Sequence, residues 1–301
     1  MATVLITGGT GLIGRHLCRQ LQERGYGVAI LSRTINSRSA IQKYYWNWGK
    51  MEIDNEAISK ADYIIHLAGE NIGEKRWTTE RKQLILDSRI KTTEFLFRKI
   101  KEQNKNLRAF ITASAVGYYG AITSDKIFTE TDIASDDFLG DICKKWEYAA
   151  DMFKESGIRT VKVRTGIVLT AKEGTLAKLS LPVKMGFASA IGNGKQYLPW
   201  IHVDDLCGIY IKAIEDNLME GAYNAVAPDH KTGKEFTRLI AHIIKMPFWF
   251  FNIPAFLIKL VFGKRSVILL TGSRISSRKI MMAGYNFRFP DLETALINLL
   301  Q

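Results

Sequence analysis

The chain has 301 residues, of which 47% are hydrophobic and 24% charged, the ordinary composition of a soluble globular protein with one large domain or a large and a smaller one. Its longest apolar stretch near the C-terminus, residues 253–262, is too short to cross a bilayer, and the chain starts on a predicted strand. We therefore expect no membrane span, no membrane partner and no signal peptide. More than half of the formal charge of +12 comes from residues 75–108. Because no nucleic-acid-binding signature is present, we interpret this basic segment as a solvated helix face and not as a nucleic-acid surface. A basic protein also suits an anionic ligand.

Residues 3–17 predict a strand, a glycine-rich turn and a helix. The apolar run 4–6 is typical of a buried parallel strand. Gly8 permits a sharp turn off that strand, Gly11 lets the backbone approach a pyrophosphate, and Gly14 lets the following helix pack close to the strand. The free N–H groups at the start of the helix would face the phosphates. The pattern indicates a dinucleotide-binding turn; the alternative is a tight turn without a ligand.

The second predicted strand, residues 28–31, ends in Ser32 and Arg33. A site for NAD usually carries Asp or Glu at this place, to bond the ribose 2′-hydroxyl. A carboxylate would repel the 2′-phosphate of NADP, whereas a guanidinium pairs with it in a fork. We therefore expect NADP(H), with Arg38 as a second partner of the phosphate; the alternative is a surface arginine that follows a strand.

The next elements are a strand at 61–67 and the small residues that follow it. Trp46 and Trp48 alternate as on a short strand, and residues 57–61 predict a short helix. Strand 61–67 leads into Ala68-Gly69-Glu70, where small side chains would allow close approach of one half of the dinucleotide. We interpret His66 as a packed residue at the end of this strand.

Strands and helices then continue to alternate. A long amphipathic helix at 78–103 precedes a strand that ends in Ser114, a Gly-Tyr-Tyr-Gly loop at 117–120, a helix at 137–153 and a strand at 159–164. This order predicts an α/β fold, a doubly wound parallel sheet of the Rossmann type with right-handed crossovers.

From residue 172 onward the pattern loosens. We expect a Rossmann domain at 1–172, to which 198–226 returns, and a smaller, mainly helical substrate-side region at 173–301. The elements expected after residue 172 are helices at 174–186, 206–214, 233–244, 254–262 and 292–299, and a strand at 221–225.

Several motifs together resemble an atypical short-chain dehydrogenase/reductase of the extended kind, in the branch labelled epimerase family. They are residues 7–14, 31–33, 66–72, Ser88-Arg89, 114–120, 143–147, 200–205 and 284–287, the last in a segment that resembles a small domain of unknown function. The resemblance covers essentially the whole chain. It implies a cofactor site made of Gly8, Thr10, Gly11, Leu12, Ile13, Gly14, Ser32, Arg33, Leu67, Ala68, Gly69 and Arg89.

The usual catalytic pair of that family is missing. Most members use Tyr-x-x-x-Lys, in which the lysine lowers the pKa of the tyrosine and the tyrosine exchanges a proton with the substrate. None of the eleven tyrosines has a lysine four residues later, and the best alignment puts Leu139 and Cys143 at the two places. Neither side chain can do this chemistry.

The remaining candidates for catalysis are Ser114, Tyr118, Tyr119 and His202. Ser114 stands where the family's Ser or Thr polarises a carbonyl, but it could simply cap a loop. The two tyrosines could donate a proton or only pack. His202 has a side chain of the type that can move protons near neutral pH, but it stands before a helix for which Asp204 or Asp205 is the expected N-cap.

The other residues with possible chemistry give no site. The cysteines lie far apart and the five histidines lack metal-ligand spacing, so we expect reduced thiols, a cytoplasmic protein and no metal. The apolar stretches 248–251 and 253–262 could cover the core or form a homodimer contact.

Two functions stay open at this point. The first is an NADP(H)-dependent oxidoreductase, or an epimerase of the nucleotide-sugar type, that acts on a small substrate of unknown identity with a non-standard proton donor. The second is a non-catalytic NADP(H)-binding regulatory or scaffold protein, related to cell division, which the missing Tyr and Lys favour. Nucleic-acid binding through the basic helix is a weaker third hypothesis.

Overall fold

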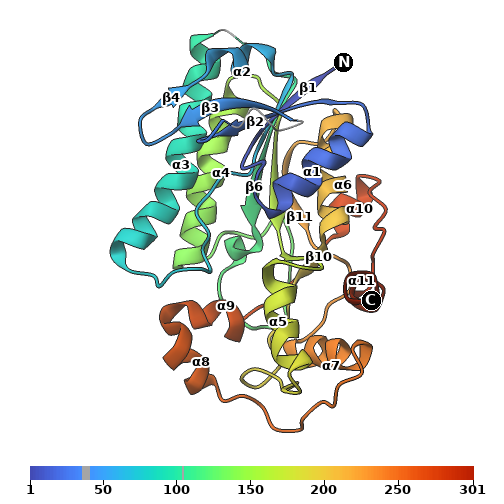
Figure 1. Ribbon diagram of the computed structural model, residues 1–301. Coiled ribbons are helices and arrows are strands. Elements are labelled where there is room, and N and C mark those ends of the chain that lie inside the picture. The colour runs from blue at the N-terminus through green and yellow to red at the C-terminus, as the bar shows by residue number, and fades with distance from the viewer. Residues whose placement is uncertain (36–40, 104) are drawn as a thin grey trace.

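The computed structural model describes residues 1–35, 41–103 and 105–301, and it has an eight-stranded sheet at its centre (Figure 1). The strand order is β11-β8-β6-β5-β1-β2-β3-β4, and every neighbouring pair is parallel except β3 and β4. The strands are β1 (Thr3–Thr7), β2 (Gly27–Ser32), β3 (Gln42–Asn47), β4 (Glu52–Ile53), β5 (Tyr63–His66), β6 (Ala109–Ala115), β8 (Thr160–Thr165) and β11 (Gly221–Ala225). The predicted α/β fold with a doubly wound parallel sheet is confirmed.

Two small parallel sheets, eleven α-helices and two 3₁₀ helices, η1 (Val116–Tyr119) and η2 (Gly263–Ser266), complete the regular structure in the described part of the chain. The small sheets pair β9 (Ile167–Leu169) with β10 (Trp200–His202), and β7 (Ile127–Phe128) with β12 (Arg274–Ile275). The helices are α1 (Leu12–Glu23), α2 (Asn55–Lys60), α3 (Thr79–Glu102), α4 (Phe138–Glu155), α5 (Gly174–Lys184), α6 (Val203–Glu215), α7 (Gly233–Ile243), α8 (Ala255–Phe262), α9 (Val267–Leu270), α10 (Arg278–Met282) and α11 (Leu292–Leu300).

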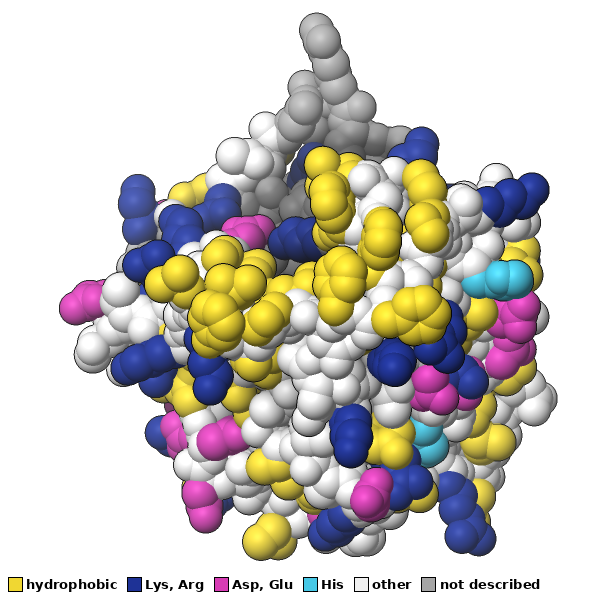
Figure 2. Space-filling model, turned by 90° about the horizontal axis from the view of Figure 1, so that it is seen from below, with side chains coloured by type: hydrophobic (Ala, Val, Ile, Leu, Met, Phe, Trp, Pro, Cys, Tyr) yellow, Lys and Arg dark blue, Asp and Glu magenta, His cyan; other side chains and the backbone are white. Residues whose placement is uncertain are grey.

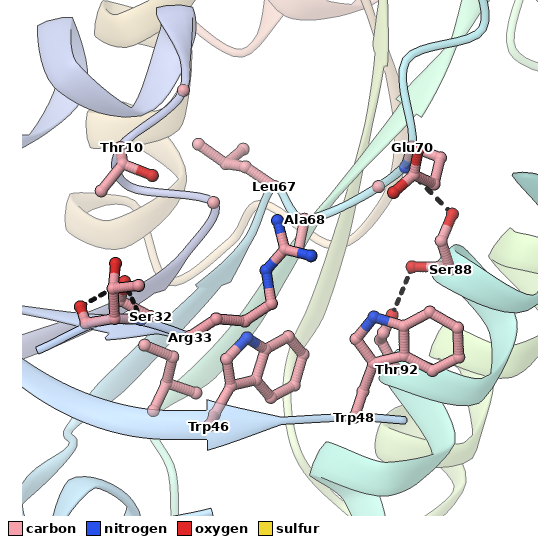
Figure 3. Close-up of a pocket in the computed structure, with 15 residues that line it drawn as sticks. Thr10, Ser32, Arg33, Trp46, Trp48, Leu67, Ala68, Glu70, Ser88 and Thr92 are labelled. Carbon is pink, nitrogen blue, oxygen red and sulfur yellow. Dashed lines mark hydrogen bonds between the residues drawn. The ribbon is translucent and has the colours of Figure 1, made fainter. Parts of the chain in front are cut away.

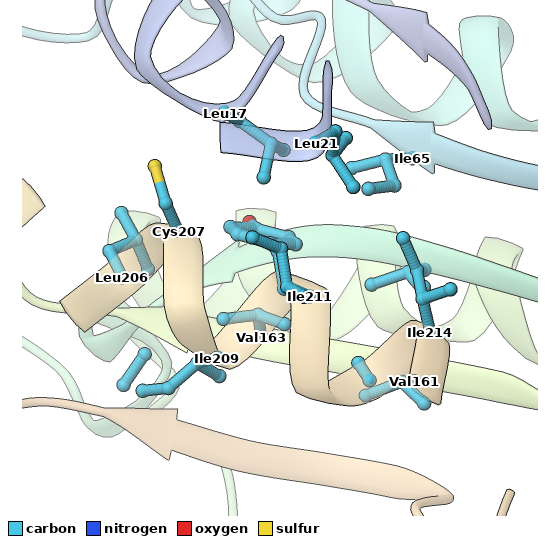
Figure 4. Packing of buried hydrophobic residues seen from close by; sticks show 14 of the residues in the cluster. Leu17, Leu21, Ile65, Val161, Val163, Leu206, Cys207, Ile209, Ile211 and Ile214 are labelled. Atoms are coloured by element: carbon cyan, nitrogen blue, oxygen red, sulfur yellow. The ribbon is translucent and has the colours of Figure 1, made fainter. Parts of the chain in front are cut away.

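The side chains of the central strands alternate between two cores. Val4 and Ile6 of β1 face a cluster built with α1 and α6, where Leu17 and Leu21 lie opposite the buried face of α6 (Figure 4). Leu5 points to the other face, where α2, α3 and α4 form a second cluster. Because both faces are covered by helices, the central strands β1 and β5 are mostly apolar, as is typical of buried parallel strands.

The chain leaves β1 for β2 on one side and later returns to β5 on the other side of β1. At this reversal the loops after the two strands separate and leave a crevice at their carboxyl ends, the usual ligand position in such sheets. Below this edge in Figure 1, α5, α7 and α11 form a third core with β9 and β10. Among the described residues, every helix is too short or too polar to cross a membrane.

Candidate functional site: a dinucleotide cavity at the sheet edge

A cavity of about 460 Å³ lies at the carboxyl ends of β1, β2 and β5 (Figure 3). Eight of the twelve predicted cofactor residues line it together: Gly8, Thr10, Gly11, Ser32, Arg33, Leu67, Ala68 and Gly69. The other lining residues are Leu31, Thr34, Trp46, Trp48, Glu70, Ser88 and Thr92. Residues far apart in the sequence meet here because the strand ends share one sheet edge.

The glycine turn has no room for larger side chains. Gly8 has a φ of +69°, which favours glycine, and a Cβ at Gly14 would lie 2.4 Å from the carbonyl oxygen of Gly8. Helix α1 starts at the N-cap Gly11 with no side-chain cap and no acidic residue in its first turn. The backbone N–H groups of Leu12 and Ile13 therefore face the turn without a competing carboxylate, which fits a pyrophosphate.

Arg33 extends from the end of β2 across the cavity, between the ring of Trp46 and Ala68 (Figure 3). Within the described part of the chain its exposed guanidinium has no hydrogen bond or ion pair. The hydroxyl of Ser32 donates to the carbonyl of Thr34 at 2.9 Å. Arg38, the second predicted partner of a phosphate, lies outside the described residues.

Glu70 is the acidic residue among those that line the cavity, and its charge is balanced. Its carboxylate accepts a hydrogen bond from Arg81 at 2.7 Å, and Arg81 is buried. Glu70 belongs to the loop after β5, so it does not stand at the end of β2, where a carboxylate would select NAD. The end of β2 thus keeps an uncompensated positive charge.

Two tryptophans form an aromatic wall that the sequence analysis did not assign to the site. Trp46 lies on β3 and Trp48 just after it, and both rings border the cavity (Figure 3). Their alternation was visible in the sequence, but the pairing of β3 beside β2 was not. A flat apolar wall beside a guanidinium suits the stacking of an adenine base.

Arg89 supports the cavity from behind and does not line it. Its guanidinium donates to the carbonyls of Ile85 and Glu70 and lies over the ring of Trp146, and a Cβ at Gly69 would meet it at 3.2 Å. Burial lowers the pKa of Arg89. Its contacts fix the Gly69–Glu70 backbone and favour a positioning role over direct cofactor contact.

His66 is fully buried, as expected, between two threonine hydroxyls. Its Nδ1 is 2.7 Å from Oγ1 of Thr7 and its Nε2 is 3.1 Å from Oγ1 of Thr92. Burial lowers the pKa of His66 to about 3, so the ring is neutral and cannot serve as an acid near neutral pH.

The positions that align with the catalytic Tyr and Lys both face the loop that follows β6. A Cβ at Gly117 would lie 3.4 Å from Cβ of Leu139 and 3.8 Å from Sγ of Cys143. Burial raises the pKa of the Cys143 thiol to about 12. Leu139 and Cys143 therefore both lie against this loop, but leucine has no proton to transfer and the protonated thiol carries no positive charge.

Ser114 and Tyr119 are bound in a buried polar network. The hydroxyl of Ser114 donates to Glu147 at 2.7 Å, and Glu147 forms a two-point ion pair with Arg164. Arg164 also donates to the hydroxyl of Tyr119 at 3.0 Å, and that hydroxyl donates to Asn224 at 2.6 Å. Burial raises the pKa of Tyr119 to about 12. In this arrangement neither hydroxyl has its hydrogen available for a substrate.

Comparison with known proteins agrees with this geometry. Residues 4–151 match the NAD dependent epimerase/dehydratase family, and residues 253–299 match a domain of unknown function, DUF1731. Epimerase family protein YfhF of Bacillus subtilis is 37% identical over 301 residues, which is 99% of this chain and 97% of that protein. The chain belongs to the epimerase family.

Two solved structures of this family are similar over the whole chain. Human epimerase family protein SDR39U1, solved with NADPH, is 32% identical with a TM-score of 0.86, and the match covers 99% of this chain and 98% of the human one. A nucleoside-diphosphate sugar epimerase from Corynebacterium glutamicum is 29% identical with a TM-score of 0.81, over 99% of this chain and 58% of that one. Both matches cover nearly all of this chain, including the residues that line the cavity.

His202 and Tyr118 are the other two candidates for catalysis, and in the described part of the chain neither belongs to the hydrogen-bond network of Ser114 and Tyr119. His202 is itself the N-cap of α6, since its Nδ1 accepts from the backbone N–H of Asp204, so the prediction of Asp204 or Asp205 as the cap is wrong. Its Nε2 is 3.2 Å from Asn298, and it stacks on Phe289. Tyr118 is half-buried, with the guanidinium of Arg164 3.4 Å from the centre of its ring.

A second, smaller cavity of about 130 Å³ lies beside Gly117 and Leu139. It is bordered by the loop after β6, by the start of α4 and by the segments around Pro199 and Thr271. Its lining is mostly apolar and holds no Lys, Arg, Asp or Glu: Val116, Gly117, Tyr119, Gly120, Ala121, Leu139, Ile167, Tyr197, Leu198, Pro199, Ile268, Thr271, Gly272, Ser273 and Ile275.

Proposed function

We propose that this chain is an NADP(H)-dependent oxidoreductase that acts on a small carbonyl or alcohol. The observation that carries the proposal is the exposed guanidinium of Arg33 across the dinucleotide cavity, with no carboxylate at the end of β2. A 2′-phosphate beside Arg33 would gain a charge-assisted hydrogen bond, and the ribose 2′-hydroxyl of NAD would lack its usual acceptor. The NADPH in the human relative's structure supports the same choice.

When bound, NADPH supplies a hydride, and this chain's own residues must handle the proton. Of the three hydroxyls we favour Tyr118, because its hydroxyl has no hydrogen bond within the described residues, whereas those of Ser114 and Tyr119 are engaged. Its ring does not line either cavity, so a substrate would have to reach it from the loop after β6. The guanidinium of Arg164 against the Tyr118 ring would hold that ring in place.

A small substrate fits better than a sugar nucleotide. An epimerase of the nucleotide-sugar type must hold a diphosphate, for which Arg and Lys are the usual partners. The cavity next to Leu139 has no charged lining residue and is much smaller than the dinucleotide cavity. This favours the oxidoreductase hypothesis over the epimerase hypothesis.

A non-catalytic NADP(H)-binding protein is the second candidate, and one observation favours it. Leu139 and Cys143 occupy the positions of the proton donor and its lysine, and burial holds the Cys143 thiol protonated. In that case cofactor occupancy would control a protein partner, and no hydride would move.

Cofactor titration followed by intrinsic tryptophan fluorescence tests the proposal, because Trp46 and Trp48 line the cavity. We expect NADPH to bind more tightly than NADH, and Arg33→Ala to weaken NADPH binding about 10- to 100-fold while NADH affinity changes little. The control is Arg108→Ala, which removes an exposed arginine just before the amino end of β6, away from the cavity at the carboxyl ends. It should change neither affinity.

Two further results would decide between the candidates. Equal affinities for NADPH and NADH in the unaltered chain would contradict the cofactor assignment. NADPH consumption with a panel of small aldehydes and ketones, reduced in Tyr118→Phe, would support the oxidoreductase. Tight NADPH binding without consumption on any member of the panel would favour the non-catalytic candidate.

A further inference from the structure

Helix α8 is apolar around nearly its whole circumference but lies at the surface. Its sequence, Ala-Phe-Leu-Ile-Lys-Leu-Val-Phe, has one charged residue, and Ile258 is its one buried side chain. Phe256 is 66% exposed, Leu260 75% and Val261 62%. An apolar helix of this kind is normally buried, because exposure of its side chains to water is unfavourable. The exposed face of α8 therefore indicates a contact with another molecule.

A second group of exposed apolar side chains adjoins α8. Met185 and Phe187 follow α5, and Phe250 and Phe251 lie in the segment that leads into α8, with Phe250 95% exposed. Trp249 joins the two segments, because its backbone N–H donates to Ala188 and its indole N–H donates to Gly186 at 2.7 Å. We call the following seven exposed residues the lower apolar surface: Met185, Phe187, Phe250, Phe251, Phe256, Leu260 and Val261.

Lysine side chains stand on the same segments as the lower apolar surface. Figure 2 shows groups of hydrophobic side chains on this face with Lys and Arg side chains beside them. Residues 236–290 contain nine Lys and Arg and no Asp or Glu. Four exposed lysines stand on the elements that carry the surface, and none has an ion-pair partner in the described ranges: Lys184, Lys245, Lys259 and Lys264.

We propose that the lower apolar surface docks on an anionic lipid membrane. Protruding Phe, Met and Leu side chains with Lys beside them are typical of a peripheral helix that inserts its apolar side to the level of the lipid headgroups. Anionic headgroups attract the lysines, whose charges no acidic neighbour in residues 236–290 offsets. The contact would be peripheral, which departs from our expectation that no membrane is involved.

A second copy of the chain fits this surface less well. A symmetric dimer brings each patch against the same patch of its partner. Lys259 and Lys264, which carry like charges, would then be brought together with no carboxylate from residues 236–290 to pair with them. The charge pattern therefore favours an anionic surface over self-association.

Vesicle co-flotation of the full-length chain tests the proposal without reference to any enzymatic activity. The vesicles contain roughly one-third phosphatidylglycerol in phosphatidylcholine, or phosphatidylcholine alone as the uncharged comparison. We expect binding to the anionic vesicles, loss of at least about tenfold in bound fraction for the double variant Phe250→Ser, Phe251→Ser, and a similar loss for Lys259→Glu, Lys264→Glu. Raising NaCl from about 0.1 M to about 1 M should weaken binding, because the Debye length falls from ~10 Å to ~3 Å.

The matched control is Leu218→Ser, which removes a side chain that is 92% exposed in the turn between α6 and β11, outside the lower apolar surface. It should bind vesicles as the unaltered chain does. All these changes are at exposed positions, so thermal unfolding should show that the variants remain folded.

Three results would overturn the proposal. The first is no binding of the unaltered chain to anionic vesicles at low salt. The second is equal binding by the Phe250, Phe251 variant. The third is a dimer in sedimentation that the same variant converts to a monomer, with vesicles having no effect, since a second copy would then be the occupant.

Discussion

The ion pair between Glu147 and Arg164 links the candidate residues at the end of β6. Their side chains are 6% and 4% exposed, and both oxygens of Glu147 accept from the guanidinium. Burial alone would lower the pKa of Arg164, but the pair with Glu147 outweighs it and raises that pKa. We expect Glu147→Gln to lower the free energy of unfolding by about 3–5 kcal/mol, because it leaves a buried charge uncompensated. Urea denaturation at neutral pH measures this.

The control for this prediction lies on the same helix. Asp141 pairs with Lys145 on α4, but both side chains are largely exposed. Solvent screens such a pair, so Asp141→Asn should cost less than about 0.5 kcal/mol. If the two variants unfold at the same urea concentration, the network around Arg164 does not hold this part of the fold.

These residues also show what single positions in the sequence could tell. Ser114 was placed correctly at the end of a strand, and the absence of a catalytic Tyr and Lys was visible from spacing alone. The partner of Ser114 was not visible, since Glu147 and Arg164 lie on α4 and β8 and meet only when the sheet forms. The role of a hydroxyl depends on which acceptor it donates to, and here that acceptor comes from residues far away in the sequence.

At the scale of elements, α1 packs so tightly against the glycine turn that the usual preference for alanine over glycine in a helix is reversed at one position. Alanine is favoured over glycine in a helix by about 1 kcal/mol. At Gly14, however, the added Cβ would lie 2.4 Å from the Gly8 oxygen and 2.5 Å from the Gly9 Cα, both backbone atoms that cannot move aside easily. We expect Gly14→Ala to destabilise the chain by about 1–3 kcal/mol and to abolish detectable NADPH binding, measured by thermal unfolding and fluorescence titration.

Gly73→Ala provides the comparison, because its added Cβ would meet nothing closer than 3.5 Å. It should stay within about 0.5 kcal/mol of the unaltered chain and keep its cofactor affinity. A Gly14→Ala chain that is more stable than the unaltered one would mean that propensity wins and the turn can relax.

Most elements could be predicted because their signals are local. The helix predicted at 78–103 is α3 (Thr79–Glu102), and the strand predicted at 221–225 is β11 (Gly221–Ala225). The start of α6 was wrong for a physical reason. His202 is not a common N-cap, and Asn298 and Phe289 from the C-terminal segment hold it there. The aromatic wall of Trp46 and Trp48 was missed for a similar reason, the unseen pairing of β3 with β2.

At the scale of the whole molecule, the C-terminal segment is attached to the Rossmann sheet through α6. Tyr285 packs against Gly208, where a Cβ would lie 2.4 Å from its hydroxyl. β11 forms an edge strand of the large sheet, and α6 precedes it. The division into a domain at 1–172, to which 198–226 returns, and a region at 173–301 stays a prediction. Sequence could not show where residues 285–289 would dock, because no local pattern encodes their contact with α6.

Asp205 is the residue through which this attachment is made. It is 1% exposed, and its carboxylate accepts from the backbone N–H groups of Arg288 at 2.7 Å and Phe289 at 2.9 Å and from the hydroxyl of Tyr285 at 3.0 Å. Asparagine has the same shape, but its amide cannot accept where an N–H faces it. We therefore expect Asp205→Asn to cost about 2–3 kcal/mol, because it removes a charged acceptor from buried donors.

The loss should be local before it is global. Hydrogen exchange in Asp205→Asn should increase in residues 285–289 and α11 while β1 and β5 stay protected. One face of these strands lies in a core that contains none of residues 285–301, and on the other face Tyr285 and Phe287 are only partly buried against the core. Asp204→Asn is the control, since Asp204 is partly exposed and its contacts with Arg288 and Gln20 are screened by solvent. Uniform loss of protection across the sheet in Asp205→Asn would instead mean that the C-terminal segment and the Rossmann sheet unfold as one unit.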